Sequence, residues 1–302
     1  MKILLLGGSG FIGSQLARKL IAAKHTITII GHEKVFSLPG AEYKQLDFIK
    51  CTNFDDCIKN VDVVIHMVST IIPSDNLQVV NQEIANNVFP TTYLLESASK
   101  LKKKIIFISS GGTVYGETTG KNSESDPTNP ICNYGISKLL IEKYLHLYNH
   151  FYNLDYRTIR LSNPYSETIY HGKKQGVIPI IIENIINDNP IEIWGKNQVR
   201  DFIHIDDVVD GIISVIDYDG KERTFNIGSG VGHTVEDIIA IASQKLNKKP
   251  TLKFSSSRKC DVEHNVLDIS LIKHKTGWKP KLSLKDGIDK IINNKLSQGV
   301  SS

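Results

Sequence analysis

Three glycines at positions 7, 10 and 13 follow the first apolar run of the chain, Lys2–Leu6, and open an amphipathic stretch, Phe11–Ala23. Glycine lets the backbone turn tightly and approach an anion without a Cβ atom in the way. The start of a helix presents free N–H groups and a positive dipole to the same anion. A strand, a glycine-rich turn and a helix in this order predict a parallel sheet whose first turn binds the pyrophosphate of a dinucleotide.

The first two thirds of the chain alternate short apolar runs with amphipathic stretches. Further strands are predicted at Thr26–Ile30, Val61–His66, Ile105–Ser109 and Tyr156–Leu161, and long helices at Val79–Leu101 and Asn133–Tyr152. Continuous apolar strands separated by helices indicate a parallel sheet that is covered on both faces. We therefore expect an α/β protein with a Rossmann-type, doubly wound parallel sheet.

The pattern changes after Asn163-Pro164, where the loops lengthen and the strands shorten. We expect residues 1–163 to form the dinucleotide-binding domain and residues 164–302 to form a smaller C-terminal α/β lobe. Residues 201–228 are expected to return to the first domain. In the second part, the pattern predicts strands Ile191–Trp194 and Arg200–Ile203 and helices Ile205–Ile216, Val235–Lys245 and Leu284–Asn293.

Composition argues against several other classes of protein. The chain has 302 residues and a formal net charge of +4, with its Lys and Arg residues scattered, so no nucleic-acid partner is expected. No apolar stretch approaches the ~20 residues that a membrane helix needs, and the apolar start is too short for a signal peptide. The four cysteines form no C-x-x-C motif, and no metal site is indicated. We expect a cytoplasmic protein without a membrane partner.

The end of the second strand commonly carries an acidic side chain that binds the adenosine ribose. Here this position falls at Gly31, and Glu33 follows two residues later between His32 and Lys34. Glu33 can reach the ribose hydroxyls of NAD, whereas His32 or Lys34 would suit the 2′-phosphate of NADP. All three can equally be solvated loop residues, so this segment leaves the choice between NAD and NADP open.

Tyr134 and Lys138 are four residues apart, which places both side chains on one face of a helix. A neighbouring ammonium and the charge of an oxidised nicotinamide would lower the pKa of the phenol from about 10. The phenolate can then take a hydroxyl proton while a hydride leaves the same carbon. The pair predicts a catalytic base and its partner, with a surface Tyr and Lys one turn apart as the alternative.

Several segments together resemble one known family. They are GGSGFIG (residues 7–13), FISSGGTVYG (107–116), the Tyr134/Lys138 pair and RLSNPY (160–165), with shorter matches at 193–195, 199–204 and 277–280. The combination is similar to the extended short-chain dehydrogenase/reductase superfamily. Within it, the chain most resembles the NAD-dependent epimerase/dehydratase branch, the relatives of UDP-galactose 4-epimerase.

The resemblance implies a cofactor site and a nucleotide-sugar site. Along the NAD cofactor it implies Gly7, Gly10, Phe11, Ile12 and Gly13 at the pyrophosphate, Asp47 and Phe48 at the adenine, Met67, Val68, Ser69 and Asn87 beside the cofactor, and Ser162 near the nicotinamide amide. On the nucleoside-diphosphate sugar it implies Asn163 at the sugar or phosphates, Trp194 at the base, and Arg200 and Arg258 at the diphosphate. Backbone groups of Gln175 and Val177 can wrap the base. The alternative pairs Arg200 with Asp201 or Asp206 and buries Trp194 in the lobe.

One position departs from the family pattern. Members usually carry a Ser or Thr four residues before the tyrosine of the V-Y-G motif, and here that residue is Gly111. The hydroxyl that binds the substrate must then come from Ser110 or Thr113, if from either. We favour Thr113.

The fold hosts several reactions, so the residues around the site must decide between them. The resemblance implies that a dehydratase needs an Asp–Glu pair at the positions of Gly112 and Thr113, and that a decarboxylase needs a Glu at Thr113. An epimerase-reductase needs a Cys and a His, and Gly111 holds the Cys position. None of these is present. The pattern favours a UDP-hexose 4-epimerase that oxidises C4 transiently. The alternatives are another dehydratase or reductase of the family, or a non-catalytic NAD(P)-binding sensor.

The two long predicted helices, Val79–Leu101 and Asn133–Tyr152, carry apolar residues on more than one face. A single sheet does not cover all of these faces. Because related enzymes pair the same two helices, the pattern predicts a homodimer through a four-helix interface.

Overall fold

The computed structural model describes residues 1–70, 79–167, 176–195 and 197–299. Within these residues, a seven-stranded sheet has the order β3-β2-β1-β4-β5-β7-β11, and all neighbouring strands are parallel. The strands are β1 (Lys2–Leu6), β2 (Thr26–Gly31), β3 (Ala41–Gln45), β4 (Val63–His66), β5 (Lys104–Ser110), β7 (Tyr156–Leu161) and β11 (Thr224–Ile227). The order reverses between β1 and β4, and ligands of such sheets bind at the carboxyl ends of the strands at this point.

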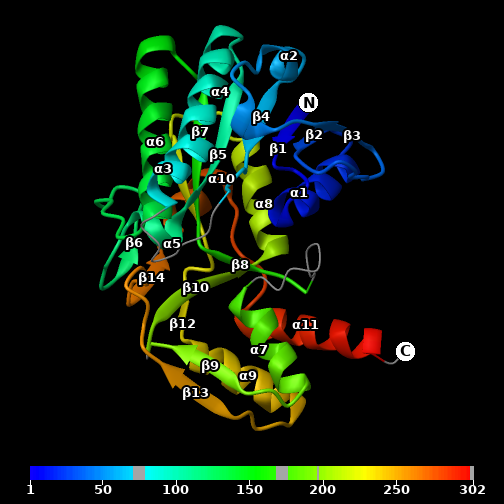
Figure 1. The fold of residues 1–302 in the computed structure, drawn as a ribbon, viewed down its shortest axis with the longest axis vertical. Helices are drawn as coiled ribbons and strands as arrows, with labels where there is room; N and C mark the ends of the chain where they lie inside the picture. Colours follow the sequence, from blue (N-terminus) through cyan, green and yellow to red (C-terminus); the bar gives the residue numbers. More distant parts are fainter. Residues whose placement is uncertain (71–78, 168–175, 196, 300–302) are drawn as a thin grey trace.

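Helices cover both faces of this sheet (Figure 1). One core packs α1 (Phe11–Ala22), α8 (Ile205–Ile216) and α10 (Ser270–Thr276) against it, and the other packs α2 (Asp55–Ile58), α4 (Phe89–Lys100) and α6 (Asn133–Tyr152). Alternate strand residues serve the two cores, with Leu5 on the α1 side and Leu4 and Leu6 on the α6 side. The doubly wound Rossmann-type fold that the sequence predicts is confirmed.

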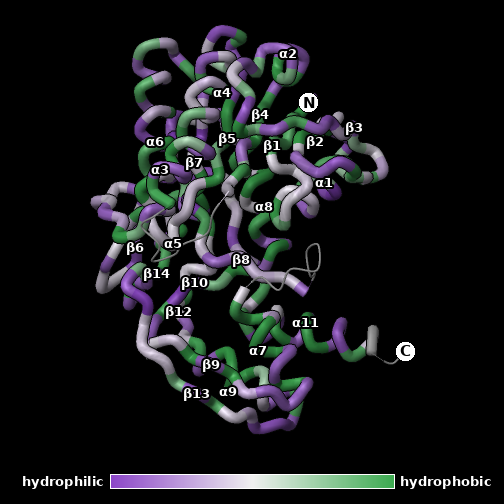
Figure 2. Tube along the Cα trace, viewed as in Figure 1, coloured by the Kyte–Doolittle hydropathy of each residue, from purple (hydrophilic) through white to green (hydrophobic). Residues whose placement is uncertain are grey.

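A smaller α/β lobe lies beyond the carboxyl end of the sheet, in the lower half of Figure 1. Its core packs α7 (Val177–Ile186), α9 (Val235–Leu246) and α11 (Leu284–Gly299) against β9 (Ile191–Trp194), which pairs in parallel with β13 (Leu252–Ser255). Helix α7 is hydrophobic along nearly its whole length (Figure 2), and Ile178, Ile181, Ile182 and Ile185 form the face that it buries in this core.

A second sheet joins the two parts. Its central strand β10 (Val199–His204) pairs with β8 (Asn163–Tyr165), β12 (Gly232–His233) and β14 (His264–Leu267), and β14 pairs with β6 (Lys121–Asn122). The chain therefore crosses between the parts more than once. Helix α8 packs against α1, and β11 forms the edge of the main sheet beside β7.

The helix predicted over Val79–Leu101 is interrupted by a wider turn. It consists of α3 (Val80–Glu83), a π-helical segment η3 (Ile84–Val88) and α4. Pro90, in the first turn of α4, has no N–H to donate and would crowd the carbonyl of the preceding turn, so the helix has a reason to widen here. Such π segments are often found at functional sites.

Candidate active site

The turn between β1 and α1 has no room for side chains on its inner side. Gly7 has a φ of +82°, and a Cβ atom on Gly13 would lie 2.6 Å from the Cα atom of Gly8. A Cβ atom on Gly10, in contrast, would meet only the Gly7 carbonyl oxygen within 4 Å, so that side of the turn is open. The turn and the N-terminus of α1 fit a pyrophosphate. The side chains of Phe11 and Ile12 are partly buried against the core, and their N–H groups lie in the first turn of α1.

A carboxylate fills the space above Gly31. The Glu33 Oε2 atom lies 2.6 Å from the point where a Cβ atom of Gly31 would stand. Ser9 donates a hydrogen bond to this oxygen at 2.7 Å, and the Tyr43 hydroxyl donates to the Glu33 carbonyl at 2.8 Å. His32 is exposed with its Nδ1 atom 3.9 Å from the Glu33 carboxylate. The acid that the sequence lacks at the end of β2 is thus supplied from two residues further on.

The surroundings of Glu33 stabilise its ionised carboxylate. Burial acts to raise the pKa of Glu33, but the hydrogen bond from Ser9, further hydrogen bonds and nearby His32 outweigh it, and the pKa lies below its usual value. An ionised acceptor suits the two ribose hydroxyls of NAD and repels the 2′-phosphate of NADP.

We expect Glu33→Gln to weaken NAD binding by about tenfold, because it removes a charged acceptor from the ribose. NAD should copurify with the wild-type protein. Mass spectrometry of the extracted nucleotide and calorimetry with NAD and NADP measure both effects. Glu42→Gln, which removes an exposed acid on β3, is the control. An unchanged preference for NAD in the Glu33 variant would contradict the assignment.

The residues predicted at the adenine divide between surface and core. Asp47 is exposed and accepts a hydrogen bond from the Ile49 N–H group, which caps a short 3-10 turn, η1 (Phe48–Lys50). The Phe48 ring is buried between Phe54 and His66, with ring centroids 5.7 and 5.2 Å away. Phe48 can therefore meet an adenine only through its backbone, whereas Asp47 can use its side chain.

The segment after β4 runs along the glycine turn. The Met67 N–H group donates to the Leu6 carbonyl at 2.9 Å, and a Cβ atom on Gly7 would lie 3.1 Å from the Val68 N atom. Asn87, on the π-helical turn, accepts a hydrogen bond from the Thr70 N–H group and donates one to the Thr70 hydroxyl. The side chain of Asn87, which is predicted to reach the cofactor, thus binds the segment that follows β4.

Tyr134 and Lys138 lie on the first two turns of α6, beside the carboxyl end of β5. Lys138 is only 5% exposed, and its Nζ atom donates to the Ile108 carbonyl at 3.0 Å. The same atom lies 5.6 Å from the Tyr134 ring centroid. Ser110 and Ser69 form hydrogen bonds with the Tyr134 phenol. The structure thus brings four of the residues chosen from the sequence together.

The electrostatics of the pair differ from the prediction. Burial first, then the nearby Glu83 carboxylate and Cys132, raise the pKa of Tyr134 to about 12, although Ser110 and Ser69 act in the opposite direction. Burial lowers the pKa of Lys138 to about 8, against the opposing effect of two carboxylates, Glu83 and Glu142. The expected lowering of the phenol pKa is therefore not produced by the protein's own groups, because desolvation outweighs them.

The departure at Gly111 has a steric cause. A Cβ atom on Gly111 would lie 2.7 Å from the Leu267 Cδ1 atom, so β14 occupies the space of the family's usual side chain. Ser110 is bonded to Tyr134, whereas the Thr113 Oγ1 atom is buried without a partner in the described part of the chain. Both hydroxyls can therefore bind the substrate: Ser110 is bonded to Tyr134, and Thr113 has no partner among the described residues.

Two further predicted residues follow β7. Among the described residues, the buried Ser162 Oγ atom has no hydrogen-bond partner, which fits a polar ligand such as the nicotinamide amide. The Asn163 Nδ2 atom donates to the Asp201 carbonyl at 2.9 Å, so part of its amide is used to join β8 to β10.

Arg200 has neither of the partners that the alternative proposed. The Asp201 carboxylate accepts from Ser229, Gly230 and Leu267, and Asp206 pairs with Lys290. Arg200 itself donates to the carbonyls of Val199 at 3.0 Å and Glu263 at 3.5 Å. The alternative that pairs Arg200 with Asp201 or Asp206 is therefore wrong, because neither carboxylate forms an ion pair with the Arg200 guanidinium.

The other residues predicted to bind the nucleotide differ in exposure and in the partners they already have. Trp194 is 51% exposed at the end of β9, so it is not part of the lobe core. Arg258 already forms a bidentate pair with Asp261, at 2.8 and 2.9 Å. Val177 is exposed at the start of α7, and Gln175 lies outside the described residues.

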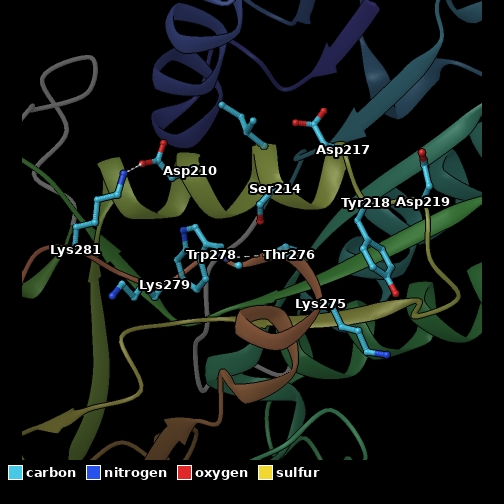
Figure 3. A pocket seen from close by; sticks show the side chains of 12 residues that line it. Asp210, Ser214, Asp217, Tyr218, Asp219, Lys275, Thr276, Trp278, Lys279 and Lys281 are labelled. Atoms are coloured by element: carbon cyan, nitrogen blue, oxygen red, sulfur yellow. Dashed lines mark hydrogen bonds and ion pairs between the residues drawn. The ribbon is translucent and has the colours of Figure 1, made fainter.

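A cavity away from this site opens beside α8 and α10, and Trp278 and Asp210 lie on its wall (Figure 3). Lys281 is paired with Asp210 there. These helices cover the face of the sheet opposite α6, so this cavity is separate from the Tyr134–Lys138 pair. Over the described ranges, no group of His, Cys, Asp or Glu is placed to hold a metal ion, and no helix is long and apolar enough to cross a membrane.

A tyrosine beside a bound nicotinamide dinucleotide can take a hydroxyl proton while the nicotinamide accepts a hydride from the same carbon. Residues 3–228 match the model of the NAD dependent epimerase/dehydratase family, and the chain belongs to this family. Its cofactor is NAD, which the open glycine turn, the Glu33 carboxylate and the unpaired Ser162 hydroxyl fit.

Individual relatives carry different activities. The chain is 34% identical to a dTDP-4-dehydro-6-deoxyglucose reductase of Escherichia coli, which covers 97% of this chain and 96% of the relative. It is also 34% identical to a putative UDP-glucose 4-epimerase of Methanocaldococcus jannaschii, over 96% of this chain and 97% of the relative. A solved UDP-glucose 4-epimerase with UDP-glucose, from Thermotoga maritima, has a TM-score of 0.88 at 27% identity and covers 99% of each chain.

Proposed function

We propose that this protein is an NAD-dependent 4-epimerase of a nucleoside-diphosphate sugar, with a UDP-hexose as substrate. The observation that carries the proposal is the Tyr134–Lys138 pair, bonded to Ser110 at the carboxyl end of β5, beside positions 111–113 that hold no acid or thiol. Elimination of water or of carbon dioxide needs such groups, whereas removal and return of one hydride needs a single base.

The reaction begins with oxidation of the sugar at C4. NAD, when bound at the glycine turn, would supply the hydride acceptor for C4 and the same hydride for the return step. Tyr134 takes the proton of the C4 hydroxyl in the first step and gives it back in the second, so no proton is consumed overall. Lys138 holds its positive charge beside the phenol, and Ser110 or Thr113 supplies the hydroxyl that orients the substrate oxygen.

Inversion requires the 4-keto sugar to present its other face. Arg200 and Trp194 would hold the diphosphate and the base, while few groups would restrain the hexose. The sugar can then rotate without leaving the enzyme. The likeness to a structure that was solved with UDP-glucose supports a UDP-linked substrate.

The test is a panel of UDP-, GDP- and dTDP-linked sugars, incubated with the protein and its copurified NAD and analysed for C4 epimers. We expect one UDP-hexose to be converted to an equilibrium mixture without net change in NADH. Absence of any epimer across the panel, with NAD bound, would contradict the proposal. A change in the redox state of the bound nicotinamide on addition of sugar nucleotide would also separate an enzyme from a sensor.

A second candidate is a reductase of a 4-keto nucleotide sugar. The 34% identity to a dTDP-4-dehydro-6-deoxyglucose reductase, over nearly the whole chain, favours it. Such an enzyme consumes one reduced cofactor per turnover. Stoichiometric loss of NADH or NADPH absorbance with a dTDP-4-keto-6-deoxy sugar, and no epimer from UDP-hexoses, would establish the reductase instead.

We further propose a homodimer through α4 and α6. Both helices expose aromatic side chains, and Phe89 and Phe151 are 58% and 65% exposed. A second copy of the same pair of helices would bury them. Light scattering at micromolar concentration should give twice the 33.7 kDa mass, and Phe151→Glu should give a monomer. Val35→Glu, at an 86% exposed apolar residue in the loop between β2 and β3, should leave the dimer intact. A monomeric wild type would contradict this proposal.

A further inference from the structure

A carboxylate is buried next to the catalytic pair and was not among the residues chosen from the sequence. Glu83 is 1% exposed, at the end of α3 directly before the π-helical turn. Its Oε1 atom accepts a hydrogen bond from the Ser137 hydroxyl at 2.5 Å. Its Oε2 atom has no hydrogen-bond partner among the described residues. A buried carboxylate with an unbonded oxygen is costly unless another charge compensates it.

The compensating charge is Lys138. It directly follows Ser137 on α6, and the Glu83 carboxylate opposes the effect of burial on the Lys138 ammonium. The other carboxylate near Lys138, Glu142, is already neutralised by Arg160, which binds it through two nitrogen atoms. Burial raises the pKa of Glu83, and the hydrogen bond from Ser137, the charge of Lys138 and the Asn87 side chain act in the opposite direction, so Lys138 is the cation that favours the ionised Glu83 carboxylate.

The remaining titratable groups around the pair carry no competing charge at neutral pH. His66, on β4, is buried and has a pKa of about 3 because of desolvation and Lys138, so it is neutral. Burial raises the pKa of the Cys132 thiol, which stays protonated. Ser110 and Ser69 are neutral donors to Tyr134. The charges that matter are therefore Glu83, Lys138 and, when ionised, Tyr134.

We propose that Glu83 is a positioning residue that balances the charge of Lys138, so that Lys138 stays an ammonium and Tyr134 stays a phenol until a cationic ring is bound beside it. The charges of the Glu83 carboxylate and the Lys138 ammonium sum to zero. Ionisation of Tyr134 then leaves one uncompensated negative charge in a buried site, which a cationic ligand can offset. This inference rests on the catalytic role proposed for Tyr134.

The effect of removing the carboxylate has a definite sign. A negative neighbour stabilises protonated forms, so its loss lowers the pKa of both Tyr134 and Lys138. The Lys138 pKa already lies at about 8, and a further fall would leave it largely neutral under physiological conditions. In Glu83→Gln, both limbs of the pH–rate profile should move to lower pH by about one unit.

The first experiment needs no substrate. The ionisation of Tyr134 is followed by tyrosinate absorbance, as the difference between each protein and the same protein carrying Tyr134→Phe. In Glu83→Gln, this difference titration should shift to lower pH by about one unit or more. Glu96→Gln removes an exposed acid on α4 and changes the net charge equally, so it should leave the titration unshifted. An unshifted titration in Glu83→Gln would overturn the proposal.

Two milder variants guard against misfolding. Ser137→Ala removes the hydrogen bond that stabilises the Glu83 carboxylate, so it should shift the titration in the same direction by less. Glu83→Asp keeps the charge and should restore the wild-type titration in part. A shift as large in Glu83→Asp as in Glu83→Gln would assign the effect to packing. If C4 epimers form but Glu83→Gln does not shift the Tyr134 titration, this inference alone is refuted. If the titration shifts but no epimers form, only the proposed reaction is refuted.

Discussion

Tyr134→Phe is expected to reduce turnover of the best sugar nucleotide by a factor of 10² to 10⁴, the usual contribution of a general base. The substitution removes the hydroxyl that receives the C4 proton but leaves the ring that packs beside Lys138. The glycine turn and Glu33 are distant parts of the site and are untouched. The variant should therefore copurify with as much NAD as the wild type.

Initial rates of C4 epimer formation, together with mass spectrometry of the extracted nucleotide, check this result. Tyr144→Phe, which removes a phenol further along α6, should behave as the wild type. Near-normal kcat in Tyr134→Phe would mean that another group takes the proton. A loss of both activity and NAD would show instead that the phenol supports the binding site.

The fold could be predicted because its determinants are local. Strands β1, β4 and β5 each contain a continuous apolar run, and α6 and α8 begin and end where the pattern predicted. Strand β3 was harder to place, because Ala41–Gln45 lies at the sheet edge with its side chains half-buried or exposed. The π-helical turn was missed, since periodicity alone does not distinguish a widened turn from an α-helix.

The site could be predicted only where its residues are close in sequence. Tyr134 and Lys138 share a helix face at a fixed spacing, and Glu142 lies one turn further, in a repeat of four that is visible in the sequence. Glu83 is 54 positions from the serine that binds it, and no local pattern marks it as buried. Gly111 and Leu267 show the same limit, because a contact between the first residue of α5 (Gly111–Val114) and the last residue of β14 depends on how the two sheets meet.

Arg200→Ala is expected to weaken binding of UDP by between several-fold and about a hundredfold. Charge-assisted hydrogen bonds from a guanidinium to phosphate are among the strongest hydrogen bonds in proteins, and each contributes about 1.5–3 kcal/mol to binding. Burial lowers the pKa of Arg200, so this side chain lacks full compensation for its lost hydration. It donates to backbone carbonyls of Val199 and Glu263, which leaves its remaining N–H groups for phosphate oxygens.

Calorimetry with UDP alone measures this effect without any turnover. Arg258→Ala should cost less than Arg200→Ala, because Asp261 already engages the Arg258 fork and must release it before it binds a phosphate. Arg18→Ala, an exposed arginine on α1, should have no effect. The free hexose should not bind measurably to any of these proteins, since the non-reacting end of the substrate provides the affinity. Equal UDP binding by the wild type and Arg200→Ala would remove Arg200 from the site, and no UDP binding by the wild type would remove the UDP-sugar assignment itself.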